Sequence, residues 1–219
     1  MDSTLLLHDD LYPKVTPAGA FYAVSSRSSS GSRKLLANLL QADINEVLSE
    51  ERLKKWAETD DTHTALNLLY RLQRLEFLYG ESKPSSKLVT VASDEFEDIL
   101  GQLSDSHRAL LVDQDGFYFA NVGFNHETAE EVANLANEVT RLSEKHSLLI
   151  KNNLNIYNNA LGICDPTGQS ELTFFPLYIG NSKNILVSAG LPLLNSEAFV
   201  TLVRGLYVLA GEDIHVVDE

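Results

Sequence analysis

Several features that define common classes of protein are scarce or missing in this chain of 219 residues. It has one cysteine, Cys164, so no disulfide can form within the chain and no thiolate cluster can hold a metal. It has no run of about 18 apolar residues, the length that crosses a bilayer. The first fourteen residues, MDSTLLLHDDLYPK, lack the basic start and long apolar core of a signal peptide. These absences predict a cytoplasmic protein that does not enter a membrane.

Basic residues are also few, with 17 Lys and Arg against 31 Asp and Glu and a net charge of −14. Residues 1–92 hold eleven basic and twelve acidic residues, a net charge of −1. Residues 93–219 hold six and nineteen, a net charge of −13. Because an acidic surface repels phosphate backbones and anionic lipids, we expect no nucleic acid or membrane partner for the second half.

Two Ser-rich stretches divide the chain, SSRSSSGSRK at 25–34 and GESKPSSK at 80–87. We therefore predict an amino-terminal segment (1–31) with a short strand at GAFYAVSS, a helical module (32–87) and an α+β domain (88–219). The helical module has three apolar-periodic segments, which begin at RKLLANLL, INEVLSEERLKKWAE and THTALNLLYRLQRLEFL. The segment KLVTVA at 87–92 is either a further strand or the end of the linker.

The pattern after residue 92 alternates between helical and strand periodicity. Ser93 precedes early acids and a helical apolar face, RALLVDQ and FYFANVG are strands around Asp-Gly, and 126–151 is a long helix. NIYNNALGIC, ELTFFPLYI and NILVSAGLPL predict three more strands, and SEAFVTLVRGLYVLAG predicts a closing helix. Two-layer burial then gives a five-stranded, mainly antiparallel sheet covered by helices, the α+β class.

The sequence DQDG at 113–116 allows three interpretations. A calcium loop starting at Asp113 is excluded, because Phe117 and Tyr118 stand where such a loop needs an oxygen ligand and glycine. A strand ending in Asp-x-Asp-Gly resembles the first motif of haloacid-dehalogenase-type phosphatases, with Asp113 as nucleophile and Asp115 as acid/base. That family has threonine where Phe117 stands. Asp-Gly between two apolar strands is also the strongest short-range signal for a hairpin, and this is the interpretation we favour.

Other chemistry has no basis in the sequence. The six histidines lack metal-ligand spacing, and Asp105, Ser106 and His107 are neighbours in sequence rather than a triad in space. There is no Walker loop and no dinucleotide fingerprint. We therefore predict that the protein is not an enzyme and has no catalytic, metal-binding or cofactor-binding residues.

The helix at 127–150 carries apolar residues at alternating spacings of three and four, which is typical of a seam that meets another helix. The seam residues are Val132, Leu135, Val139, Leu142, His146 and Leu149. Ala129, Ala133 and Ala136 widen the apolar stripe. A helix that lies only on its own sheet would use a stripe of similar width. If the alanines face the sheet, the seam is a partner surface, and we predict a homodimer that Val139→Glu weakens.

The RALLVDQDGFYFANVG hairpin, the Ala-rich AEEVANLANEV helix and the ILVSAGLPL strand before a terminal helix resemble the Roadblock/dynein-light-chain family. The resemblance covers residues 93–212. It implies dimers with apposed long helices and edge-to-edge sheets, and roles as adaptors or as binding partners of small Ras-like GTPases. The amino-terminal extension of about ninety residues departs from that family.

ALNLLYRLQRLEFLYGESK in that extension is similar to the last helix and wing of winged-helix domains. Arg71 and Arg74 are offset there by Asp60, Asp61 and Glu76, so DNA binding is the less favoured interpretation. The sequence thus predicts a non-enzymatic regulatory or adaptor protein that forms a homodimer and binds a small Ras-like GTPase or another protein. The alternative is a sensor or transcriptional regulator, with a winged-helix module coupled to a ligand-sensing α+β domain.

Overall fold

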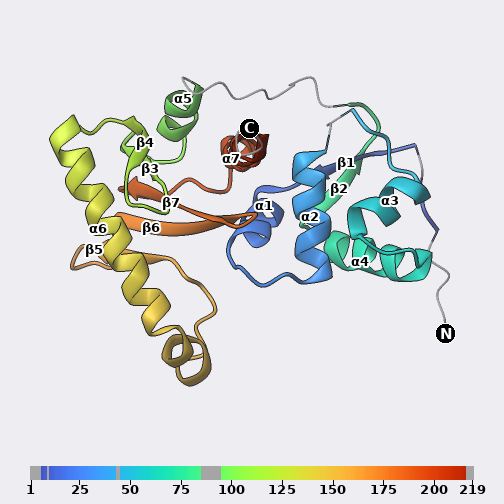
Figure 1. Cartoon of the computed structure of the whole chain (residues 1–219), viewed down its shortest axis with the longest axis horizontal. Coiled ribbons are helices and arrows are strands. Elements are labelled where there is room, and N and C mark those ends of the chain that lie inside the picture. Colours follow the sequence, from blue (N-terminus) through green and yellow to red (C-terminus); the bar gives the residue numbers. More distant parts are fainter. Residues whose placement is uncertain (1–5, 9, 43–44, 85–94, 216–219) are drawn as a thin grey trace.

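The computed structural model describes residues 6–8, 10–42, 45–84 and 95–215. The amino-terminal part forms a helical module with a two-stranded ribbon, drawn in blue to teal in Figure 1. Its elements are β1 (Tyr12–Val15), α1 (Pro17–Val24), α2 (Gly31–Gln41), α3 (Glu50–Ala57), α4 (Thr62–Arg74) and β2 (Leu78–Glu81). β1 and β2 pair antiparallel, so the end of this module lies beside its beginning.

The second part is a five-stranded sheet with the order β4-β3-β7-β6-β5, in which every neighbouring pair is antiparallel. Its strands and helices follow in chain order. They are α5 (Glu95–Gly101), β3 (Ala109–Val112), β4 (Tyr118–Val122), α6 (His126–Lys145), the π-helical turn η1 (Leu149–Asn153), β5 (Leu161–Cys164), β6 (Ser170–Ile179), β7 (Ser182–Ala189) and α7 (Glu197–His215). The predicted α+β class and the predicted order of strands and helices are confirmed.

The two faces of this sheet have separate hydrophobic clusters. Leu110, Val112 and Ile185 pack with the alanines of α6 on one face. Leu111 and Leu186 lie on the other face, where α5, α7 and α1 cover the sheet. Period-two alternation along β3 and β7 sends neighbouring residues to opposite faces. Among the helices that the structure describes, α6 covers the face of Leu110, Val112 and Ile185 (Figure 1).

The amino-terminal module shares the larger of these clusters with the sheet. Phe21 of α1 contacts Phe175 of β6 edge to face, with ring centroids 6.3 Å apart, and also contacts Phe199 of α7. The Arg204 guanidinium of α7 donates to the carbonyl oxygens of Leu40 and Ala42 at the end of α2, at 3.1 and 3.2 Å. Since a cation at a helix C-terminus satisfies carbonyls that have no partner within the helix, this contact also caps α2.

The predicted strand at GAFYAVSS is wrong, because residues 19–24 of this segment belong to α1. Thr16 caps that helix by accepting from the Gly19 N–H at 3.1 Å, and Pro17 holds the first helical position. A short apolar run does not distinguish a buried strand from a buried helix, and here burial against α7 and β6 selects the helix. The short strand of this segment is β1 instead. α2 begins inside the predicted connector, where Ser30 caps it.

Two further boundaries differ from the prediction. The long helix at 126–151 ends at Lys145, and a π-helical turn follows it. NIYNNALGIC contributes only four residues to the sheet, and its pairing stops at Leu161 opposite Phe174. Pro176 lies two residues further along β6 and has no N–H to donate, so a longer β5 would face an interrupted ladder.

The three helices α2 to α4 and the strand β2 after them are compatible with the winged-helix likeness, although the partner of β2 is the amino-terminal β1 rather than a following strand. The candidate strand KLVTVA lies outside the described residues. Within the described ranges, no helix is both long and apolar enough to cross a bilayer.

Candidate partner interface

The DQDG segment forms the tight turn of the β3–β4 hairpin. Asp113 Oδ1 accepts from the backbone N–H groups of Asp115 and Phe117, each at 2.9 Å. Gly116 has a φ of +93°, a value that favours glycine. Both carboxylates are therefore part of the turn. Asp113 stabilises it by accepting from two backbone N–H groups, and Asp115 is exposed at its tip. No group of His, Cys, Asp and Glu that could hold a metal is found among the described residues.

Asp113→Asn should leave the hairpin intact, because the amide oxygen still accepts from both N–H groups. Asp113→Ala removes the acceptor and should lower the free energy of unfolding by about 1 kcal/mol, measured by urea denaturation of both variants. A magnesium-dependent phosphatase activity that the wild type has and Asp113→Asn lacks would overturn this assignment.

Helix α6 presents its small residues to the sheet. Asn125 caps the helix by accepting from the Thr128 N–H at 2.8 Å. Ala129, Ala133 and Ala136 are fully buried in the cluster with β3, β6 and β7. One turn later, the Thr140 hydroxyl donates to the Ala136 carbonyl oxygen at 2.9 Å. Small side chains bring the α6 backbone close to the sheet, so its larger apolar residues lie on the flank and the outer side.

The six predicted seam residues divide into two groups. Val132 and Val139 are half-buried and pack against the sheet cluster. Leu135, Leu142 and Leu149 are 37%, 56% and 49% exposed, and His146 is exposed as well. A change at Val139 therefore also disturbs the contact between α6 and the sheet, whereas Leu142 reports on the outer surface alone. Whether these residues form a dimer interface stays a prediction.

The structure shows a second row at the same alternating spacing, which we call the outer stripe. It consists of Glu131, Leu135, Glu138, Leu142, Lys145 and Leu149, and all six are exposed. The first five lie on α6 and the last begins η1. The sequence prediction missed the three charged members because it followed apolar residues only. Their spacing of four and three was the available signal.

Strand β5 is an edge strand of the sheet and lies beside α6 (Figure 1). Ile163 of β5 is in register with Leu172, whose side chain packs on the α6 side of the sheet. Residues paired across neighbouring strands share a face, so Ile163 also points to the α6 side, where it is 48% exposed. The exposed leucines of the outer stripe and Ile163 therefore lie on the same side of the sheet, and Ile163 belongs to an edge strand that has no partner on its outer side.

Beyond α6, the segment 146–158 exposes further large apolar side chains that the sequence prediction did not single out. Leu148 and Tyr157 are 74% and 73% exposed, and Leu154 and Ile156 are also exposed. The segment contains Lys151 and no acidic residue, in the half of the chain that is otherwise strongly acidic. Exposed apolar surface of this extent is typical of a site that another molecule covers.

The opposite flank of α6 is held by a polar cluster. The Glu144 carboxylate accepts from the Lys183 ammonium and from the Tyr178 hydroxyl, each at 3.4 Å. Burial and the neighbouring Glu144 raise the pKa of Tyr178, so its phenol stays protonated and donates. The Arg27 guanidinium lies over the Tyr178 ring, 5.3 Å from its centroid. These contacts fix α6 on the sheet and leave the outer stripe as its accessible side.

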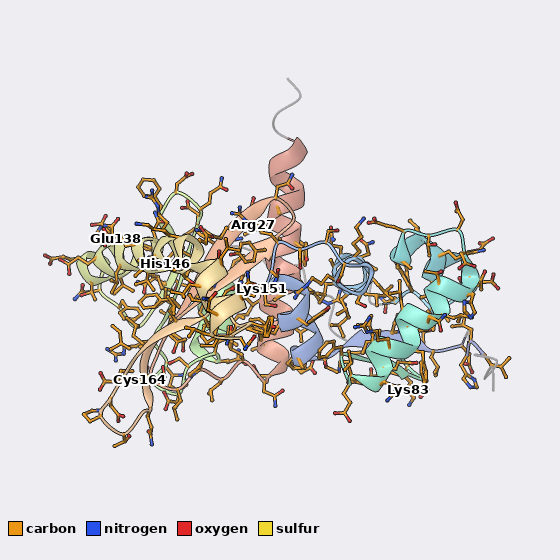
Figure 2. The ribbon with its side chains drawn as sticks, turned by 90° about the horizontal axis from the view of Figure 1, so that it is seen from below. Arg27, Lys83, Glu138, His146, Lys151 and Cys164 are labelled. Carbon is orange, nitrogen blue, oxygen red and sulfur yellow. The ribbon has the colours of Figure 1, made fainter. Side chains whose placement is uncertain are left out.

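The base of segment 146–158 is also attached to the amino-terminal module. The Asn159 amide donates to the Ser25 carbonyl oxygen at 3.0 Å, across 134 positions of sequence. Figure 2 shows Arg27 of the same connector on the side of the molecule that carries His146 and Lys151. Ser25 and Arg27 of the connector therefore contact the second part of the chain next to this segment and to the polar cluster of α6.

The five-stranded antiparallel sheet, with the long Ala-faced helix α6 on one face and α5, α7 and α1 on the other, defines an α+β domain. Comparison with solved structures finds two partial likenesses. A Roadblock/LC7 domain from Streptomyces avermitilis is 14% identical with a TM-score of 0.30, over 50% of this chain and 85% of that one. MglB of Myxococcus xanthus is 12% identical with a TM-score of 0.34, over 57% of this chain and 95% of that one.

No protein-family model matches the chain, and no curated protein is significantly similar to it in sequence. Both TM-scores are below 0.5.

Proposed function

We propose that this protein is a non-enzymatic regulatory or adaptor protein that forms a homodimer through α6 and the β5 edge, and that the dimer binds a small Ras-like GTPase or another protein. The observation that carries the proposal is the exposed apolar row Leu135, Leu142 and Leu149 on a helix whose small face already covers the sheet. These three leucines lie outside the hydrophobic cluster that α6 forms with the sheet.

A second copy of the chain is the simplest cover for this row. Closed twofold dimers are the commonest assemblies, and a twofold interface uses the same patch on both copies. Ile163 and the unpaired side of β5 extend the patch, since two edge strands can pair across the same axis. The apolar part of the interface then lies at its centre, with charged residues around it, which is the usual anatomy of a protein interface.

The GTPase part of the proposal is supported by the Roadblock resemblance of residues 93–212. An adaptor function also fits the acidic surface of the second half, which selects protein partners over phosphate-rich ones. A single protomer offers one row of this kind, whereas a dimer offers a composite surface with two symmetric flanks. We therefore expect the dimer to be the form that binds a partner.

Two measurements test the proposal. Sedimentation velocity of the full chain at micromolar concentration should give the mass of a dimer. Immobilised protein should then retain a Ras-like GTPase differently in its GTP-analogue and GDP-loaded forms. A wild type that is monomeric over the micromolar range would contradict the proposed assembly. Sequence-selective retention of duplex DNA at physiological salt would favour a transcriptional regulator instead.

A further inference from the structure

Segment 146–158 is folded although most of its side chains are exposed. Its first part contains the π-helical turn η1, which Figure 1 shows at the far end of α6. Asn155 has a φ of +55°, so the chain reverses there, and the Ile156 N–H donates to the Ile150 carbonyl oxygen at 3.0 Å. A surface that is already ordered loses little conformational entropy when a partner binds.

The charge of this segment differs from that of the domain around it. Residues 93–219 hold six basic and nineteen acidic residues. Residues 145–158 contain Lys145 and Lys151 and no acidic residue. Both lysines are exposed, and neither forms an ion pair within the described ranges. Exposed apolar side chains and two available positive charges therefore lie together on a short stretch of chain.

These charges do not suit a second copy of the chain as the molecule that covers the segment. A twofold contact uses the same patch on both copies, so the lysines would meet lysines, and the segment has no carboxylate to separate them. A contact with a different, acidic patch of a second copy would be heterologous, and such contacts continue into filaments unless they close into a ring. Charge complementarity instead fits another protein that supplies the carboxylates.

The backbone of the segment indicates what form that partner takes. An extended peptide binds by adding to an unpaired strand, and between the end of α6 and the start of β5 the chain forms η1 and no strand. A helix satisfies its own backbone hydrogen bonds, so it needs only side-chain contacts. An amphipathic helix also carries an apolar stripe with polar residues along its borders. With acidic borders, it matches an apolar patch that contains lysines.

We propose that segment 146–158 is a docking surface for an acidic amphipathic helix of another protein. Leu148 and Tyr157, which are 74% and 73% exposed, are its main apolar contacts, and Lys145 and Lys151 bind the carboxylates of the helix. Tyrosine is among the residues that contribute most to interface affinity. The inference states the chemistry of a partner for the proposed adaptor function, on which it rests, and it does not require the homodimer.

Fluorescence anisotropy with two labelled peptides tests the proposal. One peptide is a helix of about five turns with leucine on one face and glutamate on the other, and the second has lysine in place of every glutamate. The full chain should bind the glutamate peptide at least about tenfold more tightly at low salt. This is the opposite of the preference that a net charge of −14 gives to nonspecific binding. The preference should shrink in 1 M salt, where the Debye length is about 3 Å.

Two variants locate the site. Tyr157→Ser and Lys151→Glu should each raise the Kd for the glutamate peptide about tenfold. Both residues are exposed, so the fold is retained. Tyr70→Ser on α4 and Lys55→Glu on α3 are the matched controls, because they make the same changes at exposed positions of the amino-terminal module. They should leave the Kd unchanged.

A preference for the lysine peptide, or unchanged binding in both segment variants, would overturn the proposal. Loss of the dimer mass in Tyr157→Ser would assign the surface to a second copy. Cosedimentation with phosphatidylserine vesicles that Lys151→Glu abolishes, without binding of the glutamate peptide, would assign it to a lipid surface. Either result also overturns the proposal. A dimeric wild type that does not bind the peptide contradicts this inference alone, whereas a monomer that binds it contradicts only the proposed assembly.

Discussion

Leu142→Glu is expected to convert the protein from a dimer to a monomer at micromolar concentration. Leu142 is 56% exposed in the protomer, so a glutamate there stays in contact with water and the fold is retained. In the proposed dimer, the same residue is desolvated against the partner. Central apolar contacts of this kind contribute about 2 kcal/mol or more each. Because every 1.4 kcal/mol is tenfold, we expect the Kd to rise at least about 30-fold.

Sedimentation velocity and the far-ultraviolet circular dichroism of the same sample separate loss of the dimer from loss of the fold. Leu75→Glu is the matched control, because Leu75 is 50% exposed at the end of α4, in the amino-terminal module. It introduces the same side chain and should remain dimeric. Leu142→Met preserves an apolar side chain and should also remain dimeric. A Leu142→Glu variant with the wild-type mass would assign the exposed leucines to another role.

The α+β domain was predictable because its strands and helices carry strong local signals. Asp115-Gly116 marks the β3–β4 hairpin, and period-two alternation in its strands separates the two faces of the sheet. Asn125 is a capping residue that marks the start of α6. The alanines of α6 form a face of small side chains, which can pack closely on a sheet. Each of these signals depends on residues that are close together in the sequence, so it can be recognised without the tertiary structure.

The predictions of secondary structure were wrong in segments whose conformation depends on contacts with residues far away in the sequence. The apolar residues of GAFYAVSS fit a buried strand as well as a buried helix, and packing against α7, α2 and β6 acts together with the Thr16 cap to select the helix. Tyr12–Val15 contains Pro13, which counts against a strand, yet β1 is an edge strand of a two-stranded ribbon and tolerates it. Each of these segments pairs with or packs against residues more than sixty positions away or in the second half of the chain.

The candidate interface shows the same limit within one helix. Counting threes and fours from Leu135 and Leu142 selects either Val132 and Val139 or Glu131 and Glu138 as their companions. Both rows satisfy the spacing, and the apolar pair is the natural choice from sequence. Because Ala133 and Ala136 are buried against the sheet, the helix is rotated so that Val132 and Val139 are half-buried. Glu131 and Glu138 then lie on the exposed side. The orientation of the helix, which no local pattern encodes, therefore decides which charges a partner meets.

Gly19→Ala is expected to be the most destabilising single-methyl change in the amino-terminal module. An ideal Cβ at Gly19 would lie 2.1 Å from the Phe77 carbonyl oxygen and 2.9 Å from the Phe77 carbonyl carbon. Both are backbone atoms, so neither can rotate away. The same carbonyl accepts from the Thr16 N–H at 3.0 Å, and the Tyr22 ring stacks on the Phe77 ring at 4.9 Å. To admit the methyl group, α1 must move away from these contacts.

We expect Gly19→Ala to lower the free energy of unfolding by about 3 kcal/mol, the upper range for an overpacked site. For a chain of this length, that corresponds to a fall in Tm of roughly 6–12 °C. Gly211→Ala is the control, because Gly211 is also helical and a Cβ there meets nothing within 4 Å. Alanine is the better helix former, so this variant should gain about 0.5–1 kcal/mol. Differential scanning calorimetry of both variants should show Tm shifts of opposite sign. An unchanged Tm for Gly19→Ala would mean that α1 does not approach Phe77 as closely as the structure places it.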